Sequence, residues 1–218
     1  MKKNRIFKQN INKISSKFYL FVGLVFFLCG SASAQIWYIN NTADLNAFAD
    51  SVNGGVVPIG QVVKIDDNAD MTEPFYRIIG NDTNYFRGTF DGNGHTITIN
   101  LTTDSTNNRE YVGLFSKVDG EVIHLSVTGS INVGSGNQYV GGICGKLLGG
   151  DITNCSNFAD IFGDTSNYTP AFTGGICGEA YGGISNCINN GSICGGQYVG
   201  GIVGWIKPNN FNDCGNAG

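Results

Sequence analysis

A short glycine-rich stretch that recurs four times decides the fold of this chain. Its copies are Gly113-Leu114-Phe115-Ser116, Gly142-Ile143-Cys144-Gly145, Gly175-Ile176-Cys177-Gly178 and Gly201-Ile202-Val203-Gly204. Their first residues lie 29, 33 and 26 positions apart. Repeats of this length are typical of solenoids, in which each repeat buries its apolar side against its neighbours. We attribute the longest spacing to a polar loop, residues 164–170, inserted at one corner.

Apolar residues recur at three places in each repeat and define three columns. The first column is Phe115, Cys144, Cys177 and Val203; the second is Leu125, Cys155, Cys187 and Cys214; the third is Ile131, Ile161 and Ile193. Three short strands per repeat, stacked at about 4.8 Å, would place each column in a line. A propeller blade needs four strands and about 40 residues or more. The sequence therefore predicts an all-β fold, a right-handed parallel β-helix (solenoid).

Polar residues flank the second column at fixed positions. His124, Asn154, Asn186 and Asp213 directly precede it, and Asn157, Asn189 and Asn216 stand two positions after it. Asn and Asp tolerate left-handed turn geometry. Amide side chains stacked in a column can also hydrogen-bond to one another. We therefore interpret His124 as a turn residue and not as a catalytic one.

At these residues the chain resembles the GLUG-motif repeat family, named for a Gly-Leu-hydrophobic-Gly signature, here with Ile in place of Leu. Residues 86–97 resemble the element that often precedes these repeats, so the resemblance extends from Phe86 to Gly218. The first copy departs from the signature, with Ser116 where Gly is expected. The resemblance implies a β-helical segment of exported bacterial proteins, often surface proteins, adhesin-like proteins or secreted peptidases. It implies no catalytic residues.

The first 34 residues have the pattern of a signal peptide. Six basic residues precede an uncharged apolar run from Phe18 to Cys29, and Ala32-Ser33-Ala34 supplies the small residues that signal peptidase accepts. The apolar run is too short to cross about 30 Å of hydrocarbon as a helix. We expect cleavage after Ala34, a secreted or cell-surface location, and no membrane span in the mature chain.

Removal of the signal peptide changes the charge balance. Six of the 13 Lys and Arg leave with it, so 7 face all 17 Asp and Glu, a net charge of −10. Such an acidic surface repels phosphate backbones and anionic headgroups, which argues against nucleic-acid and membrane binding.

The mature chain divides into two parts. Residues 35–108 are predicted to form an N-terminal cap and the first strands, with a short capping helix over Thr42–Asn53 and strands at 62–65, 76–79, 86–90 and 95–101. Residues 109–218 form the glycine-rich repeats. The last repeat lacks its third column, so we expect a truncated product that self-associates through its open last coil.

Several groups were weighed as chemical sites. The second and first columns accept Leu, Phe or Val beside Cys, which predicts buried free thiols and not disulfides or zinc ligands. Asp66, Asn68 and Asp70 resemble part of a calcium loop, but Arg77 stands where a bidentate Glu belongs. We therefore interpret residues 66–70 as a solvated loop. The alternative is a weak calcium site. Asp91 and His95 could form an acid–base pair, but both belong to a turn. We expect no cofactor and no metal.

Two functions from different classes follow. The first is a non-catalytic module of an exported bacterial surface protein, a stalk or an adhesion or binding scaffold for carbohydrate or a host or cell-surface protein. Tyr38, Tyr111, Tyr139 and Tyr198 could stack on sugar rings. The alternative is a polysaccharide-acting β-helix enzyme, a lyase or glycosidase, which rests on fold analogy alone. Such an enzyme needs carboxylates gathered on one face, and from Gly113 onwards the acidic residues are expected at differing repeat positions.

Overall fold

The computed structural model describes residues 35–103, 110–136, 139–165, 171–208 and 210–218. The predicted signal peptide, residues 1–34, lies outside this range, and so does most of the predicted corner loop at 164–170. Within the described ranges, no helix has the length and apolar character needed to cross a membrane.

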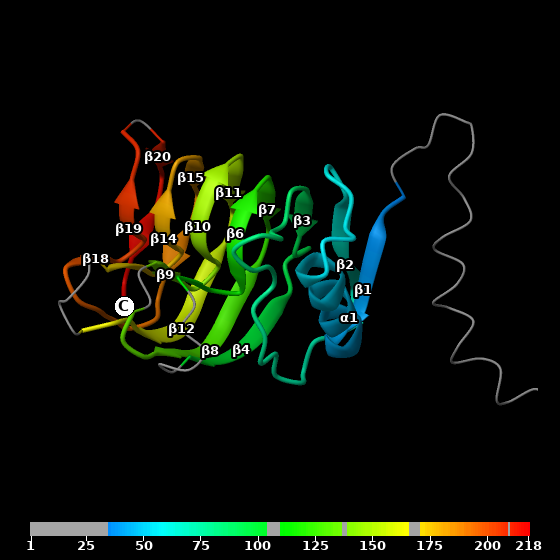
Figure 1. The fold of residues 1–218 in the computed structure, drawn as a ribbon, viewed down its shortest axis with the longest axis horizontal. Coiled ribbons are helices and arrows are strands. Elements are labelled where there is room, and N and C mark those ends of the chain that lie inside the picture. The colour runs from blue at the N-terminus through cyan, green and yellow to red at the C-terminus, as the bar shows by residue number, and fades with distance from the viewer. Residues whose placement is uncertain (1–34, 104–109, 137–138, 166–170, 209) are drawn as a thin grey trace, which may run out of the picture. The chain divides into compact units, whose positions relative to one another are not determined.

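The described residues fold as a parallel β-solenoid preceded by one helix, which confirms the predicted fold class. The coils stack from the helix α1 at the blue end of the ribbon to β19 and β20 at the red end (Figure 1). Every strand pair in the stack is parallel, as expected when each coil continues into the next. Each coil exposes backbone groups that the next coil satisfies, so coils stabilise one another.

Four sheets run along the solenoid, and we number them in the order in which the chain visits them within one coil. Sheet 1 contains β5 (Tyr111–Val112), β9 (Tyr139–Gly141), β13 (Phe172–Gly174) and β18 (Tyr198–Gly200). Sheet 2 contains β6 (Phe115–Asp119), β10 (Cys144–Gly149), β14 (Cys177–Ala180) and β19 (Val203–Ile206). Sheet 3 contains β1 (Trp37–Asn41), β2 (Val62–Asp70), β3 (Thr89–Asp91), β7 (Glu121–Ile123), β11 (Asp151–Thr153), β15 (Gly183–Ser185) and β20 (Phe211–Asn212). Sheet 4 contains β4 (Thr96–Thr103), β8 (Ser126–Val133), β12 (Ser156–Phe162), β16 (Ile188–Asn189) and β21 (Gly215–Asn216), with β17 (Ile193–Cys194) beside β12.

From β5 onwards a coil contributes strands to four sheets, whereas the sequence predicted three strands per coil. The additional strands are those of sheet 1, the two or three residues before each glycine corner. Their outward side chains are large aromatics, which the search for inward apolar columns does not find.

The capping helix α1 (Thr42–Asn53) has the predicted bounds. Asn41 caps its N-terminus, where its side chain accepts a hydrogen bond from the Asp44 amide at 2.9 Å, and Gly54 caps its C-terminus. Phe48 is fully buried and lies against Trp37, Phe86 and Phe90, with ring centroids 5.6, 5.5 and 5.9 Å away. The helix therefore covers the apolar end of the first coil, which would otherwise face water.

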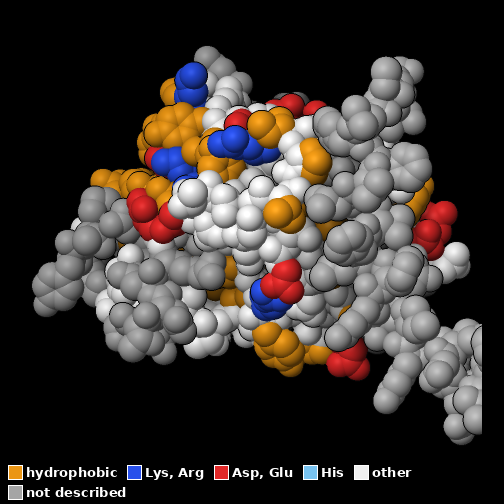
Figure 2. Space-filling view, turned by 45° about the vertical axis from the view of Figure 1, so that its right-hand side comes forward, with side chains coloured by type: hydrophobic (Ala, Val, Ile, Leu, Met, Phe, Trp, Pro, Cys, Tyr) orange, Lys and Arg blue, Asp and Glu red, His pale blue; other side chains and the backbone are white. Residues whose placement is uncertain are grey.

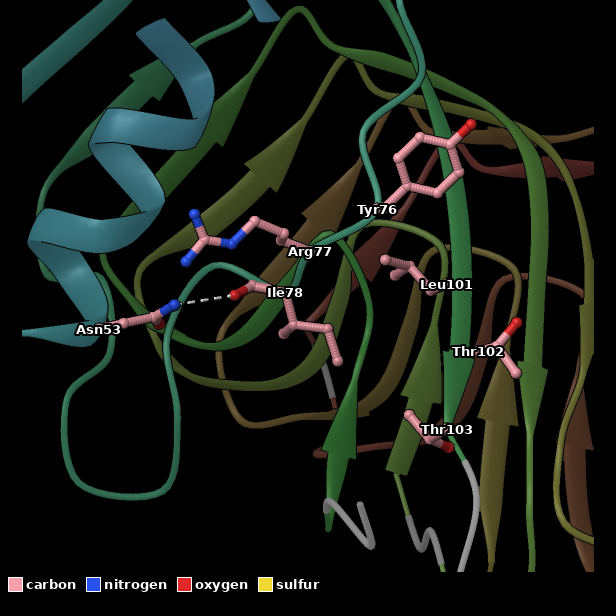
Figure 3. A pocket seen from close by; sticks show the side chains of 7 residues that line it. All are labelled: Asn53, Tyr76, Arg77, Ile78, Leu101, Thr102 and Thr103. Carbon is pink, nitrogen blue, oxygen red and sulfur yellow. Dashed lines mark hydrogen bonds between the residues drawn. The ribbon is translucent and has the colours of Figure 1, made fainter. Parts of the chain in front are cut away.

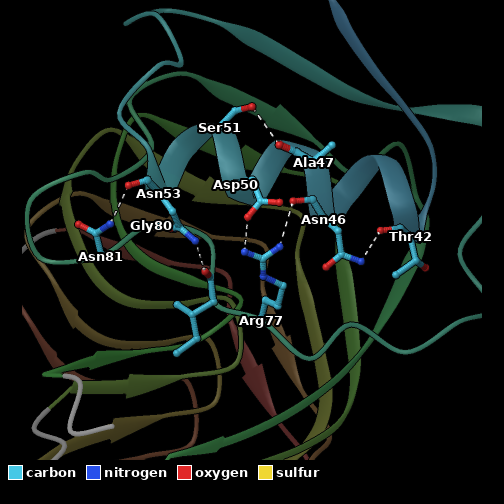
Figure 4. A network of polar contacts seen from close by, with 10 residues as sticks. Thr42, Asn46, Ala47, Asp50, Ser51, Asn53, Arg77, Gly80 and Asn81 are labelled. Atoms are coloured by element: carbon cyan, nitrogen blue, oxygen red, sulfur yellow. Dashed lines mark hydrogen bonds and ion pairs between the residues drawn. The ribbon is translucent and has the colours of Figure 1, made fainter. Parts of the chain in front are cut away.

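A polar network ties α1 to the chain that follows β2 (Figure 4). Arg77 forms an ion pair with Asp50, and this hydrogen bond lowers the pKa of Asp50. The Asn53 side chain donates to the Ile78 carbonyl at 3.3 Å and accepts from the Gly80 amide at 2.7 Å. The predicted strand at 76–79 is therefore wrong. Its backbone bonds to helix side chains and pairs with the sheets only through an isolated bridge between Ile79 and Phe115.

The acidic segment 66–70 also differs from the prediction of a solvated loop, because it lies inside strand β2. Asp66 accepts a hydrogen bond from the Asn68 amide at 3.1 Å, and the hydroxyl and amide of Thr72 lower the pKa of Asp70. Among the residues that the structure describes, no group of His, Cys, Asp or Glu side chains is placed to hold a metal ion.

Inward side chains stack in register along the solenoid. Cys144 pairs with Phe115 and Cys177, and Cys177 pairs with Val203. Ile161 pairs with Ile131 and Ile193. Leu125, Cys155 and Cys187 accept backbone hydrogen bonds from the residues that follow Cys155, Cys187 and Cys214. All six cysteines of the described ranges are free thiols. Burial raises the pKa of Cys144, which favours an uncharged, apolar thiol.

The turn between sheets 3 and 4 contains a residue with left-handed backbone geometry in five successive coils. Asn93, His124, Asn154, Asn186 and Asp213 have φ angles of 52°, 51°, 55°, 52° and 48°. This conformation costs Asn and Asp less than other side chains. His124 thus occupies a turn position that Asn or Asp fills in the other coils.

Buried amides form a ladder inside the last three coils. The Asn157 side chain donates to that of Asn189 at 2.7 Å, and the Asn189 side chain donates to that of Asn216 at 2.7 Å. Asn157 and Asn189 are fully buried. A Cβ atom at Gly175 would lie 2.6 Å from the Asn189 side-chain oxygen. The repeated glycine therefore leaves room for the amide ladder beside it.

Candidate functional site

A ladder of aromatic rings runs along the outside of sheet 1. Tyr111, Tyr139, Phe172 and Tyr198 are in register, with successive ring centroids 5.0, 5.3 and 4.7 Å apart and rings within 15° of parallel. Because neighbouring rings cover one another's faces, the middle rings have no face left for a ligand. This geometry therefore does not support the predicted sugar stacking on Tyr139, which is a middle ring; the ladder joins adjacent coils.

A column of outward side chains lies beside the aromatic ladder, on the outside of sheet 2. It consists of Lys117, Lys146, Glu179 and Trp205, which pair in register along β6, β10, β14 and β19. Each stands two positions after a residue of the first apolar column and directly before an inward residue of its strand, so alternation along the strand turns its side chain outward; the inward residues are Val118, Leu147, Ala180 and Ile206. This regular spacing was present in the sequence, but the four residue types differ and so gave no repeat signal.

Lys146 and Glu179 form an ion pair at the centre of this column. The ammonium nitrogen lies 2.5 Å from a Glu179 carboxylate oxygen, and the two side chains are only 16% and 10% exposed. The Lys146 nitrogen also lies 5.0 Å from the Tyr139 ring centroid and 5.1 Å from that of Tyr181. Burial lowers the pKa of Lys146, but the hydrogen bond and charge of Glu179 outweigh it, so the pKa lies above its ordinary value.

Basic and aromatic side chains meet again nearer the N-terminus. The Arg87 guanidinium lies 4.4 Å from the Tyr85 ring centroid, and the Lys117 nitrogen lies 4.7 Å from that of Tyr111. Lys117 also donates to the Asp82 carbonyl at 2.7 Å. Seven Lys and Arg residues follow residue 34, and three of them, Arg87, Lys117 and Lys146, thus contact rings on this side. Hydrophobic and basic side chains are intermingled at the upper left of the surface in Figure 2.

The last two coils present an aromatic pair whose rings are not stacked in parallel. The centroids of Tyr181 and Trp205 lie 5.4 Å apart, and the rings meet at 51°. Tyr181 is 43% exposed and Trp205 is 38% exposed. A tilted, solvent-accessible pair offers ring surface that the middle rings of the ladder do not. We call the two columns with this pair the aromatic–lysine face (Tyr111, Lys117, Tyr139, Lys146, Phe172, Glu179, Tyr181, Tyr198 and Trp205).

The other residues considered in the sequence are placed elsewhere. Tyr38 is 48% exposed on β1, in sheet 3 at the far end of the stack. Asp91 does not pair with His95; its carboxylate lies 3.2 Å from Nδ1 of His124, one coil further on. The interpretation of both residues as turn residues stands, because the Asp91 carboxylate also accepts a hydrogen bond from the Asn93 amide at 2.9 Å. The backbone of His95 closes the turn by bonding to the Gly92 carbonyl, while stacking brings His124 over Asp91.

Two acidic residues occupy equivalent positions on the outside of sheet 3. Val122 pairs with Ile152, so Glu121 and Asp151, which precede them, occupy the same position in adjacent coils. The expectation that acidic residues fall at differing repeat positions is wrong for this pair. Glu121 also accepts a hydrogen bond from the Thr89 hydroxyl at 3.3 Å.

A hollow of about 260 Å³ opens between α1 and sheet 4 (Figure 3). Its lining includes Asn53, Tyr76, Arg77 and Thr102. Arg77 is engaged by Asp50 and by the Asn46 carbonyl, and Asn53 bonds to Ile78. The polar groups of this hollow therefore serve mainly to hold the cap in place.

The parallel coils with glycine corners define a β-helical repeat protein. Within it, a family model described as the GLUG motif matches residues 136–161, consistent with the GLUG-motif repeat family. The match spans β9, β10, β11 and most of β12, with the left-handed Asn154 and the ladder amide Asn157. Comparisons with curated proteins and with solved structures found no match.

Proposed function

We propose that this chain is a non-catalytic binding module of an exported bacterial surface protein, and that it binds carbohydrate at the Tyr181–Trp205 end of the aromatic–lysine face. It acts outside the cytoplasm, as part of a stalk or adhesion scaffold. The observation that carries the proposal is the exposed, tilted ring pair on a rigid stack of coils.

Several features support a binding role for this pair. Aromatic side chains provide large contact area at little conformational cost and dominate binding energy where they are exposed. Lys146 lies against the Tyr181 ring, and its ion pair with Glu179 anchors the strand that leads to Tyr181. The pair is therefore held in one arrangement before a ligand arrives, which reduces the entropy lost on binding.

Replacing Trp205 or Tyr181 with alanine is expected to weaken binding to a polysaccharide by about tenfold or more. The measurement is affinity electrophoresis and calorimetry of residues 35–218 against a panel of neutral and acidic polysaccharides. Tyr38→Ala is the matched control, because Tyr38 is equally exposed on a different sheet. Binding that is unchanged in both variants would overturn the proposed face. Binding only to a protein of the cell surface would replace carbohydrate as the ligand.

The proposed export of the protein can be tested separately. The native protein is expected outside the cytoplasm with Gln35 as its first residue, because small residues precede this position. Intact mass and N-terminal peptide mapping of the native protein test this. Recovery of the protein from the cytoplasm with residues 1–34 retained would contradict it.

Glu121 and Asp151 favour a second candidate, a polysaccharide-acting enzyme. Two carboxylates in adjacent coils are the groups that glycoside hydrolysis requires. Shortened products in the binding mixtures, absent with Glu121→Gln, would favour this candidate over the binding module.

A further inference from the structure

A second hollow, of about 460 Å³, lies on sheet 3 across the last three coils. Its lining includes Asp151, Gly182, Gly183, Ser185, Asn210 and Asn212. Strand alternation explains why this lining is polar. Ile152 and Ile184 point into the core, so Asp151 and Thr153, with Gly183 and Ser185, face outward.

The hollow exists because a glycine interrupts the outward column. Asp151 pairs with Gly183 in register, and one Asp151 carboxylate oxygen accepts the Gly183 amide at 3.0 Å. A Cβ atom at Gly183 would lie 2.4 Å from that same oxygen. Any larger residue would therefore fill the hollow and displace the carboxylate.

The polar groups that remain in the hollow are mostly hydrogen-bond acceptors. The side-chain NH₂ of Asn210 donates to the Tyr181 carbonyl at 2.7 Å, and that of Asn212 donates to Asp213 at 2.8 Å. Among the described residues, no protein group bonds to the amide oxygens of Asn210 and Asn212 or to the second carboxylate oxygen of Asp151. A carboxylate and two amide oxygens match a ligand that brings several O–H donors.

The hollow adjoins the aromatic pair through the chain itself. Tyr181 directly precedes Gly182, and the Asn210 side chain fixes the Tyr181 carbonyl. A ligand in the hollow can thus continue around the corner of the coil to the Tyr181 and Trp205 rings.

From this arrangement we infer that the Asp151–Asn212 hollow is a subsite for one uncharged sugar unit of a polysaccharide, and that it selects neutral sugars over acidic ones. The inference rests on the proposed function and specifies its ligand class. Asp151 accepts hydroxyl groups of a neutral ring, whereas its charge repels a uronate or sulfate at the same place. Gly183 limits the subsite to a ligand that lies flat against the sheet.

The test compares oligogalacturonides as free acids with the same chains fully methyl-esterified, together with neutral gluco- and manno-oligosaccharides. Residues 35–218 are expected to bind at least one neutral probe at least tenfold more tightly than the free acid. Asp151→Ala and Gly183→Ala are each expected to weaken neutral binding about tenfold, while Asp151→Asn reduces the discrimination against the acid. Asp160→Ala is the matched control, because Asp160 is also exposed and accepts an amide one coil on, from Ser192 at 3.1 Å, but on sheet 4.

The outcomes separate the subsite from the proposed function. If Trp205→Ala abolishes binding while the Asp151 and Gly183 variants bind as the parent does, the subsite is wrong and the binding function stands. Equal or tighter binding of the free acid by the parent also refutes the subsite. If no probe binds the parent protein, both fail. Thermal unfolding of each variant, with the exposed Asp151→Ala as the least disruptive change, excludes misfolding as the cause.

Discussion

Replacing Phe90 with alanine is expected to lower the free energy of unfolding by about 3–5 kcal/mol. Phe90 is fully buried, and its ring centroid lies 5.9 Å from Phe48, 6.5 Å from Phe86 and 5.3 Å from Phe115. Phe90 therefore joins the capping helix to the first coils. Its replacement by alanine leaves a buried cavity that the surrounding side chains cannot fill. Chemical denaturation of residues 35–218, followed by circular dichroism, measures the effect.

Phe158→Ala is the matched control for this prediction. Phe158 is 49% exposed on the outer face of β12, so the same atoms are removed without a buried cavity. Its free energy of unfolding should change by about 0.5 kcal/mol or less. Equal effects of the two variants would show that the cluster around Phe90 does not hold the cap to the solenoid.

Replacing Asn189 with alanine is expected to cost about 3 kcal/mol, because it leaves several buried polar groups without partners. The Asn189 side chain donates to the Gly191 carbonyl at 2.8 Å and to Asn216 at 2.7 Å, and it accepts from Asn157. The Gly191 amide also donates to its oxygen at 3.3 Å. Denaturation measures the loss, and hydrogen exchange of the Gly191 amide should become faster.

Asn190→Ala provides the comparison for the amide ladder. Asn190 is exposed, and only its backbone amide bonds into the stack, to the Asn157 carbonyl at 2.8 Å. This variant should keep the stability of the parent within about 0.5 kcal/mol. Unchanged protection of the Gly191 amide in Asn189→Ala would mean that water replaces the ladder at no cost.

Local patterns in the sequence were enough to predict the solenoid and its cap. The recurring glycines mark the corners, and Asn41-Thr42 followed by Leu45, Phe48 and Val52 defines the bounds of α1. The left-handed turns were equally predictable, since Asn or Asp recurs at the required position in nearly every coil. In each of these cases the residues that determine the local structure lie close together in the sequence.

The candidate sites depend instead on which residues of different coils become neighbours. Tyr181 and Trp205, Lys146 and Glu179, Asp91 and His124, and Glu121 and Asp151 are each 24 to 33 residues apart in the sequence and adjacent in space. The spacing between coils varies, because corners differ in length, so the register of outward side chains was not predictable. Outward positions are also free of the packing constraint that keeps inward columns apolar.

The sequence by itself thus determined a parallel stack of coils closed by a helix, because buried apolar columns and glycine corners allow little else. Only the tertiary structure decided that rings stack along sheet 1 and that a missing side chain at Gly183 opens a polar hollow beside Tyr181. The physical reason is that burial selects residue type at each inward position, whereas the chemistry of the outer surface arises from the register between coils.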